Sequence, residues 1–173
     1  AMNISDGQEF CEQEVIQFLN ETTGSVASVF WNFGDNAFIP GLPNATSTID
    51  NPTFAYNNFV FGPYTVTLGI TDAAGCYEQT QTTIVIRDKP RAGFSSNIVC
   101  EGVATDFTDE SNVNASVIDT WQWDLGDGTG TATTANPSYS YTQAGVYQAE
   151  LVVETDHGCK DTIIEDVIVN ATP

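Results

Sequence analysis

The sequence predicts an all-β fold made of two β-sandwiches in tandem. Three observations predict it: alternating apolar and polar segments, the lack of a sustained helical period, and landmarks that occur twice. Residues 64–70 and 147–153 both alternate, as a strand with one buried face does. Gly, Pro, Asn and Asp separate such runs at turns. Each copy would hold about seven short strands in about 85 residues, which is typical of an immunoglobulin-like sandwich.

The repeat is visible as paired residues that keep their order along the chain while the spacing between the copies drifts through the loops. Two copies of one fold look like this after their loops have changed length. We therefore expect one domain over residues 1–88 and a second over residues 89–173. The paired landmarks are Cys11 and Cys100, Phe18 and Phe107, Trp31 and Trp123, Tyr64 and Tyr147, and Cys76 and Cys159.

The charge of the chain excludes several classes of partner. Its 173 residues include 23 acidic and 4 basic side chains, for a net charge of -19. Nucleic-acid backbones and anionic membrane surfaces both need clustered Lys and Arg, so neither is an expected partner. The sequence also has no uninterrupted apolar stretch of about 18 residues, so we expect no membrane insertion. These features favour a soluble binding or structural protein.

The most specific motif is Trp-Asp-Leu-Gly-Asp-Gly at residues 123–128. It resembles the WDFGDG signature of PKD (polycystic kidney disease) domains, and Pro137-x-Tyr139-x-Tyr141 follows it as in that family. The first copy carries the shorter match Trp-Asn-Phe-Gly-Asp at residues 31–35. The resemblance implies a PKD-type sandwich in both copies. We interpret five motif residues as core anchors or turn formers: Trp31, Asp35, Trp123, Asp124 and Asp127.

The Gly-Cys pairs and the Cys that precedes the second strand of each copy resemble PKD repeats in large secreted proteins of Bacteroidetes, including gliding-motility and adhesion proteins. This resemblance implies a secreted, cell-surface stalk or adhesin module. Such a module acts as a spacer, contacts neighbouring repeats of its own chain, and can meet surface glycans or proteins. The alternative is an accessory spacer or polysaccharide-binding module of a secreted hydrolase or protease, where PKD domains also occur.

The sequence gives little support for a catalytic site or a metal site. His157, the single histidine, lies in a predicted turn, and no G-x-S-x-G motif exists. We expect no enzyme and no cofactor. Calcium is the metal to consider, because oxygen ligands gather at Asp106, Asp109 and Glu110. No EF-hand spacing accompanies them, and a generally acidic surface explains the same residues, so both interpretations stay open.

Two loops of the first copy are longer and more apolar than those of the second. Residues 36–50 correspond to 128–135, and 57–61 correspond to 142–144. Apolar residues gathered in a loop usually mark a contact surface. We expect this one to face the second copy near the turn of His157, and a ligand patch is the alternative. The expected contact residues are Phe38, Leu42, Phe59, Phe61 and His157.

Four cysteines in a secreted chain suggest disulfides. One pairing within each copy would be Cys11–Cys76 and Cys100–Cys159. Immunoglobulin-like topology places the members of each pair at opposite ends of a sandwich, about 20 Å apart, whereas bridged Cα atoms lie within about 7 Å. The other pairing is Cys11–Cys159 between the copies, with the remaining two cysteines pairing with modules outside this sequence. We favour this second pairing.

Three of the four basic residues, Arg87, Lys89 and Arg91, lie within five residues around Pro90. They could form an anion site. We favour the alternative, an exposed linker that lowers the repulsion between two acidic domains, because interdomain linkers are normally exposed and polar.

Overall fold

The structure is a computed structural model that describes residues 1–35, 45–57 and 60–173. The chain divides into two compact units, Ala1–Arg87 (unit 1) and Asp88–Pro173 (unit 2). The boundary lies one residue before the expected 88/89. The described residues form strands, turns and loops without a helix, which confirms the predicted all-β class. None of them belongs to a helix long and apolar enough to cross a bilayer.

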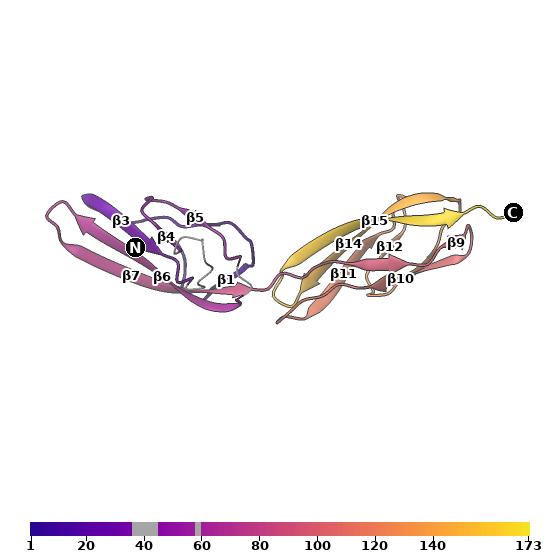
Figure 1. Cartoon of the computed structure of the whole chain (residues 1–173), viewed down its shortest axis with the longest axis horizontal. Helices are drawn as coiled ribbons and strands as arrows, with labels where there is room; N and C mark the ends of the chain where they lie inside the picture. Colours follow the sequence, from indigo (N-terminus) through magenta and orange to yellow (C-terminus); the bar gives the residue numbers. More distant parts are fainter. Residues whose placement is uncertain (36–44, 58–59) are drawn as a thin grey trace. The chain divides into compact units, whose positions relative to one another are not determined.

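Unit 1 consists of a five-stranded sheet in the order β1-β7-β6-β3-β4 and a two-stranded sheet of β2 and β5. Figure 1 shows β3, β6 and β7 side by side. The strands of unit 1 are β1 (Gln8–Cys11), β2 (Ile16–Gln17), β3 (Val26–Asn32), β4 (Thr46–Ser47), β5 (Thr53–Phe54), β6 (Gly62–Asp72) and β7 (Tyr77–Arg87).

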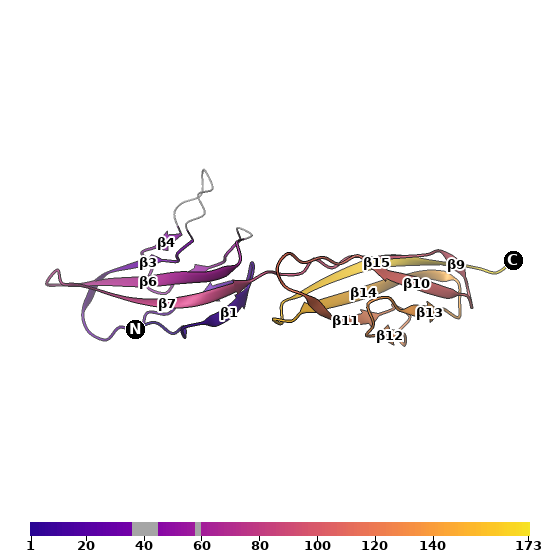
Figure 2. The same ribbon diagram turned by 90° about the horizontal axis from the view of Figure 1, so that it is seen from below.

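Unit 2 repeats this plan with a five-stranded sheet in the order β12-β11-β14-β15-β9 and a three-stranded sheet in the order β13-β10-β8. Figure 2 shows β14 and β15 running together along the unit. The strands of unit 2 are β8 (Phe94–Ser96), β9 (Val99–Cys100), β10 (Ala104–Asp109), β11 (Ile118–Asp124), β12 (Thr131–Ala132), β13 (Ser138–Ser140), β14 (Gly145–Thr155) and β15 (Lys160–Asn170).

The longest hairpins come from the alternating segments. On β6 the side chains of Tyr64, Val66 and Leu68 are buried, because every second residue of a strand points to the same face. On β14 the buried residues at the same spacing include Ala149, Leu151 and Val153. The expectation of short strands is wrong for these hairpins, since β6, β7, β14 and β15 each contain 11 residues.

Each unit has its own aromatic core. Trp31 on β3 is fully buried, and its ring lies 5.7 Å from that of Phe18. Trp123 on β11 is 3% exposed and lies 5.3 Å from Phe107. Tilted rings at such separations gain from the attraction between ring edges and faces as well as from burial. Two separate cores explain why the chain divides into two units.

A short parallel strand closes one edge of each large sheet. β1 pairs with β7, and this register places Cys11 opposite Arg87 at the end of β7. β9 pairs with β15 and places Cys100 opposite Asn170 at the end of β15. Covering this edge protects backbone groups that would otherwise be open to pairing with another chain. It also fixes one cysteine of each unit at one end of an eleven-residue strand.

Candidate functional site

The Gly-Asp motif of unit 2 forms a closed turn. The Asp124 carboxylate accepts a hydrogen bond of 2.9 Å from the backbone N–H of Gly126. The Asp127 carboxylate accepts hydrogen bonds from the hydroxyl of Tyr139 and from the N–H groups of Gly130 and Thr129. These donors, led by the Tyr139 hydroxyl, lower the pKa of Asp127 to about 2. Both carboxylates are therefore used inside the fold.

Unit 1 builds the same turn with other residues. The Asn32 side chain takes the place of Asp124. Its Oδ1 accepts a hydrogen bond of 2.8 Å from the N–H of Gly34. In both units a buried tyrosine then ties the turn to the core. Tyr56 donates to the carbonyl of Phe33 at 2.7 Å, and Tyr141 donates to that of Leu125 at 2.8 Å. Burial raises the pKa of both phenols, and the negative charge of Asp35 adds to the effect at Tyr56.

Two of the three calcium candidates have hydrogen-bond partners for their side chains within the protein. The two carboxylate oxygens of Asp109 accept from the indole N–H of Trp121 at 2.6 Å and from the N–H of Ser111 at 3.0 Å. Glu110 accepts from the hydroxyl of Ser95 at 2.7 Å. Asp106 lies three residues before Asp109 on β10, and this odd spacing points the two side chains to opposite faces.

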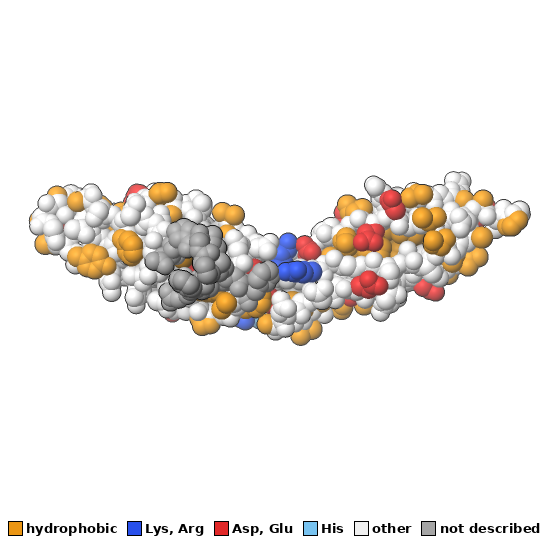
Figure 3. Space-filling model, in the orientation of Figure 1, with side chains coloured by type: hydrophobic (Ala, Val, Ile, Leu, Met, Phe, Trp, Pro, Cys, Tyr) orange, Lys and Arg blue, Asp and Glu red, His pale blue; other side chains and the backbone are white. Residues whose placement is uncertain are grey.

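Among the described residues, no three acidic, histidine or cysteine side chains gather as a metal site would require. Figure 3 shows acidic side chains scattered over the visible face of unit 2. Calcium needs six to eight converging oxygens, and the three candidates Asp106, Asp109 and Glu110 do not provide such a group.

The expected contact loops are only partly described. Phe38, Leu42 and Phe59 lie outside the described residues. Phe61 is half-buried, and His157 is exposed with its Nε2 3.9 Å from a carboxylate oxygen of Asp156. The expected contact of these side chains with the other repeat stays a prediction.

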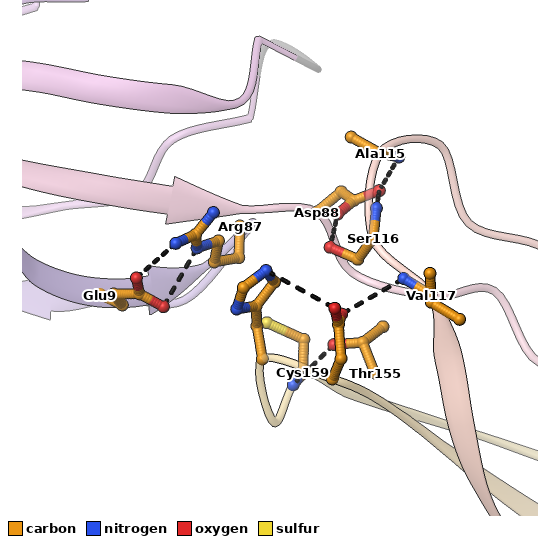
Figure 4. Close-up of polar contacts among 10 residues, drawn as sticks. Glu9, Arg87, Asp88, Ala115, Ser116, Val117, Thr155 and Cys159 are labelled. Carbon is orange, nitrogen blue, oxygen red and sulfur yellow. Dashed lines mark hydrogen bonds and ion pairs between the residues drawn. The ribbon is translucent and has the colours of Figure 1, made fainter.

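A buried carboxylate with several hydrogen bonds lies where unit 2 begins. The Asp88 side chain is buried, and one carboxylate oxygen accepts the N–H groups of Asn114, Ala115 and Ser116. The other oxygen accepts the hydroxyl of Ser116 (Figure 4). Burial alone would raise the pKa of Asp88, but these donors outweigh it and the pKa is lowered. The carboxylate therefore stays charged and binds the loop before β11.

Lys89, Arg91 and Ala92 also form hydrogen bonds or ion pairs within unit 2. We call residues 88–92 the anchored segment. Lys89 forms an ion pair of 3.0 Å with Asp161 on β15. The same Asp161 side chain accepts the N–H of Ala92 at 2.9 Å. Arg91 exchanges two backbone hydrogen bonds with Asn112, of 2.8 and 3.0 Å. The segment thus follows a fixed path along unit 2.

Two of the three basic side chains in this region, those of Arg87 and Lys89, have acidic partners. Arg87 binds Glu9 of β1 through two guanidinium nitrogens, within unit 1 (Figure 4). Lys89 binds Asp161 as described above. Sequence reasoning noticed the basic residues but missed Glu9, Asp88 and Asp161. The sequence signal for Asp88 was its position between the basic residues Arg87 and Lys89, just before Pro90.

The cysteines fall into two chemical states. Cys11 and Cys159 are disulfide-bonded, whereas Cys76 and Cys100 are free thiols. Within unit 1, Cys11 lies opposite Arg87 and Cys76 precedes Tyr77, so they mark the two ends of β7. An eleven-residue strand extends about 33 Å, whereas a disulfide needs Cα atoms within about 7 Å. Unit 2 separates its two cysteines by β15 in the same way, so a bridge within either unit is out of reach.

Comparison with known proteins adds the family. A family model described as PKD domain matches residues 1–86 and again residues 87–169. The chain is 36% identical over 86 residues to collagenase ColA of Bacillus cereus, a match that covers 47% of this chain and 8% of that protein. It is 29% identical over 98 residues to a microbial collagenase of Vibrio alginolyticus, covering 55% of this chain and 12% of that protein.

The comparison with solved structures found, among others, two single domains. The PKD1 domain of Vibrio anguillarum Epp has 27% sequence identity and a TM-score of 0.46, covering 50% of this chain and 99% of that one. The PKD1 domain of the Vibrio cholerae metalloprotease PrtV has 34% identity and a TM-score of 0.43, covering 48% of this chain and 99% of that one.

Proposed function

The chain belongs to the PKD domain family, since the family model matches both repeats, and on this premise we propose that it is a pair of non-catalytic spacer domains in a larger extracellular protein. One observation carries the proposal. The first residue after Arg87 is already bound within unit 2, because the Asp88 carboxylate accepts the N–H groups of residues 114–116. A flexible tether would be solvated and unbonded, whereas a spacer that holds its neighbours benefits from a connection with a fixed path.

The motif residues support a structural role. Asp124 and Asp127 accept hydrogen bonds within their own turns, and Tyr141 donates to the backbone of Leu125. Residues that stabilise turns in this way are committed to the fold and are not available as acid, base or nucleophile. This supports the interpretation that the chain itself performs no catalysis.

The simplest proposal for the larger protein that contains this domain pair is a hydrolase. The two curated relatives described above are named as collagenases, and the matched region is 8% of one and 12% of the other. A domain pair of this size would then be an accessory to a separate catalytic domain. Disulfides persist in oxidising, extracellular compartments, so the bonded state of Cys11 and Cys159 agrees with that location.

A second candidate is the stalk of a cell-surface adhesin, and the cysteine pattern favours it. Cys76 and Cys100 are thiols at opposite ends of their units, as expected if further modules adjoin them. The reading frame that encodes the chain decides between the two functions. An adjoining catalytic domain supports the hydrolase accessory, and a long series of further repeats supports the stalk. Contacts with glycans or proteins remain compatible with either.

Hydrogen exchange tests the spacer function through Asp88. In the wild-type chain, the amides of Asn114, Ala115 and Ser116 should be protected, because each donates to the Asp88 carboxylate. Asp88→Ala should lower the free energy of unfolding of unit 2 by about 2–4 kcal/mol, since three donors lose their acceptor. The variant should expose those amides and make the anchored segment sensitive to protease.

Asp166→Ala serves as the matched control, because Asp166 is an exposed residue of β15. It should leave both exchange and proteolysis unchanged. Rapid exchange at residues 91–92 and 114–116 in the wild-type chain would show a free tether and would contradict the spacer function.

A further inference from the structure

The two units contain the same pair of cysteine positions, which we name the strand position (Cys11 and Cys100) and the turn position (Cys76 and Cys159). At the strand position two backbone hydrogen bonds recur in both units. The residue after the cysteine donates its N–H to the end of the long strand, Glu12 to Arg87 at 2.8 Å and Glu101 to Asn170 at 2.9 Å. Each cysteine carbonyl then accepts at 3.1 Å from the residue three positions later.

The turn position matches equally well. In unit 1, Asp72 donates its N–H to the carbonyl of Cys76 at 3.0 Å and accepts the N–H of Gly75 at 3.1 Å. In unit 2, Thr155 donates its N–H to the carbonyl of Cys159 at 2.9 Å and accepts the N–H of Gly158 at 2.8 Å. Both cysteine N–H groups also donate to the side chain of the residue four positions earlier. The local backbone is therefore one structure in two copies.

The chemical state differs although the backbone does not. At the strand position Cys11 is disulfide-bonded and Cys100 is a thiol, while at the turn position Cys159 is bonded and Cys76 is a thiol. Each unit thus has one bonded and one free cysteine, in complementary positions. Because its counterpart forms a disulfide from the same local structure, each free thiol occupies a position that is already shaped for one.

Both thiols can be reached from outside. Cys76 is exposed, and Cys100 is half-exposed. Cys76 also borders a cavity of about 430 Å³ in unit 1, which is lined by residues 22–26 and the start of β7. The long strand between the two positions of each unit prevents an internal bridge. If either thiol forms a disulfide, its protein partner therefore comes from outside its own unit.

We propose that Cys76 and Cys100 are the open halves of a repeating crosslink, in which the strand position of one PKD module bonds to the turn position of another. The partner for both is a further copy of this module, which deepens the spacer function on which the proposal rests. Two thiols lose two protons and two electrons as the S–S bond forms. The electrons pass to an external disulfide, such as oxidised glutathione, which is reduced to two thiols.

A mixing experiment with two variants tests the proposal. Cys76→Ser keeps only the strand-position thiol, and Cys100→Ser keeps only the turn-position thiol. Equimolar variants in a glutathione redox buffer should form a covalent mixed dimer that exceeds either homodimer about tenfold, since exchange favours pairs with compatible geometry. Non-reducing electrophoresis measures the yield, and mass spectrometry should identify the Cys76–Cys100 peptide.

Three controls complete the test. The wild-type chain should form a ladder of dimers and higher multimers, whereas the double variant Cys76→Ser/Cys100→Ser should stay monomeric. Circular dichroism should show unchanged strand content in every variant. Equal yields of homodimer and mixed dimer, or no mixed dimer at all, would overturn the proposal. Such a failure would leave the spacer function intact, because hydrogen exchange at Asp88 measures that function separately.

Discussion

At the scale of single residues, two acidic side chains, one in the motif and one at the start of unit 2, accept several hydrogen bonds each. Asp127 accepts from one phenol and two backbone N–H groups, and Asp88 accepts from three successive backbone N–H groups. An ionised carboxylate with several donors is a strong acceptor, and its proton affinity falls accordingly. In a chain with 23 acidic residues, these carboxylates stand out by their hydrogen bonds.

The first prediction concerns pH and Asp127. Its pKa is lowered to about 2 by the Tyr139 hydroxyl and the Gly130 and Thr129 amides. A carboxylate with a lowered pKa in the folded state stabilises the fold above its unfolded pKa of about 3.9, and this stabilisation is lost as the pH falls from there towards 2. Thermal unfolding measured between neutral pH and pH 2 should show the loss.

Asp127→Asn should unfold at a lower temperature at neutral pH and approach the wild-type midpoint near pH 2, because the lost charge matters only where the wild-type residue is ionised. Glu165→Gln removes an exposed charge from β15 and is the control. If Asp127→Asn and Glu165→Gln gave the same pH profile, the hydrogen bonds of Asp127 would not be the cause.

At the scale of elements, the motif turns pack against the long hairpins through glycine. Gly126 has a positive φ of 77°, and an added Cβ would lie 2.4 Å from the carbonyl oxygen of Gln148 on β14. At Gly34, an added Cβ would lie 2.5 Å from the carbonyl oxygen of Thr65 on β6. The contact partner is backbone in both cases and cannot rotate away. Glycine is therefore required twice over, by the backbone conformation and by the close approach.

The second prediction separates these two requirements. Gly126→Ala should lower the free energy of unfolding of unit 2 by about 3–5 kcal/mol, because backbone strain and overlap with β14 add together. Gly128→Ala is the matched control, since Gly128 also has a positive φ, 80°, but has nothing within 4 Å of an added Cβ. It should cost only about 1 kcal/mol, the strain alone. Equal losses in chemical denaturation would show that the close approach to β14 is unimportant.

At the scale of the whole molecule, the cysteines and the anchored segment concern how modules are joined. Cys11 lies opposite Arg87, the last residue of unit 1. Cys159 lies two residues before Asp161, which binds Lys89 and Ala92 at the start of unit 2. Both bonded cysteines thus lie, within their own units, beside the covalent connection. The disulfide between Cys11 and Cys159 that the sequence favours stays a prediction.

The third prediction is the result of peptide mapping under non-reducing conditions. A digest should release a crosslinked peptide pair containing Cys11 and Cys159, because a bridge within either unit would have to span an eleven-residue strand. Alkylation before digestion should label Cys76 and Cys100, which are thiols in the single chain. Recovery of a Cys11–Cys76 peptide would contradict the strand register of unit 1, and recovery of a Cys100–Cys159 peptide would contradict that of unit 2.

The sequence by itself determined the all-β class, the two repeats and the family, because each depends on local signals. Alternation along residues 64–70 and 147–153 reports burial directly, and Trp123 to Gly128 forms a contiguous motif. It also correctly placed the cysteines of each copy at opposite ends of a sandwich, since strand order follows from the fold class. The strand lengths were underestimated, because pairing with a long neighbour extends a strand beyond its own alternating pattern.

Only the tertiary structure decided what the polar side chains do. Asp88 and the N–H groups of residues 114–116 are far apart in sequence, as are Lys89 and Asp161, and composition gives no sign that they meet. The calcium candidates show the converse, because Asp106 and Asp109 are close in sequence but point to opposite faces of β10. A strand turns neighbours away from each other and brings distant residues together, so the partners of a polar group become known only once the strands are paired.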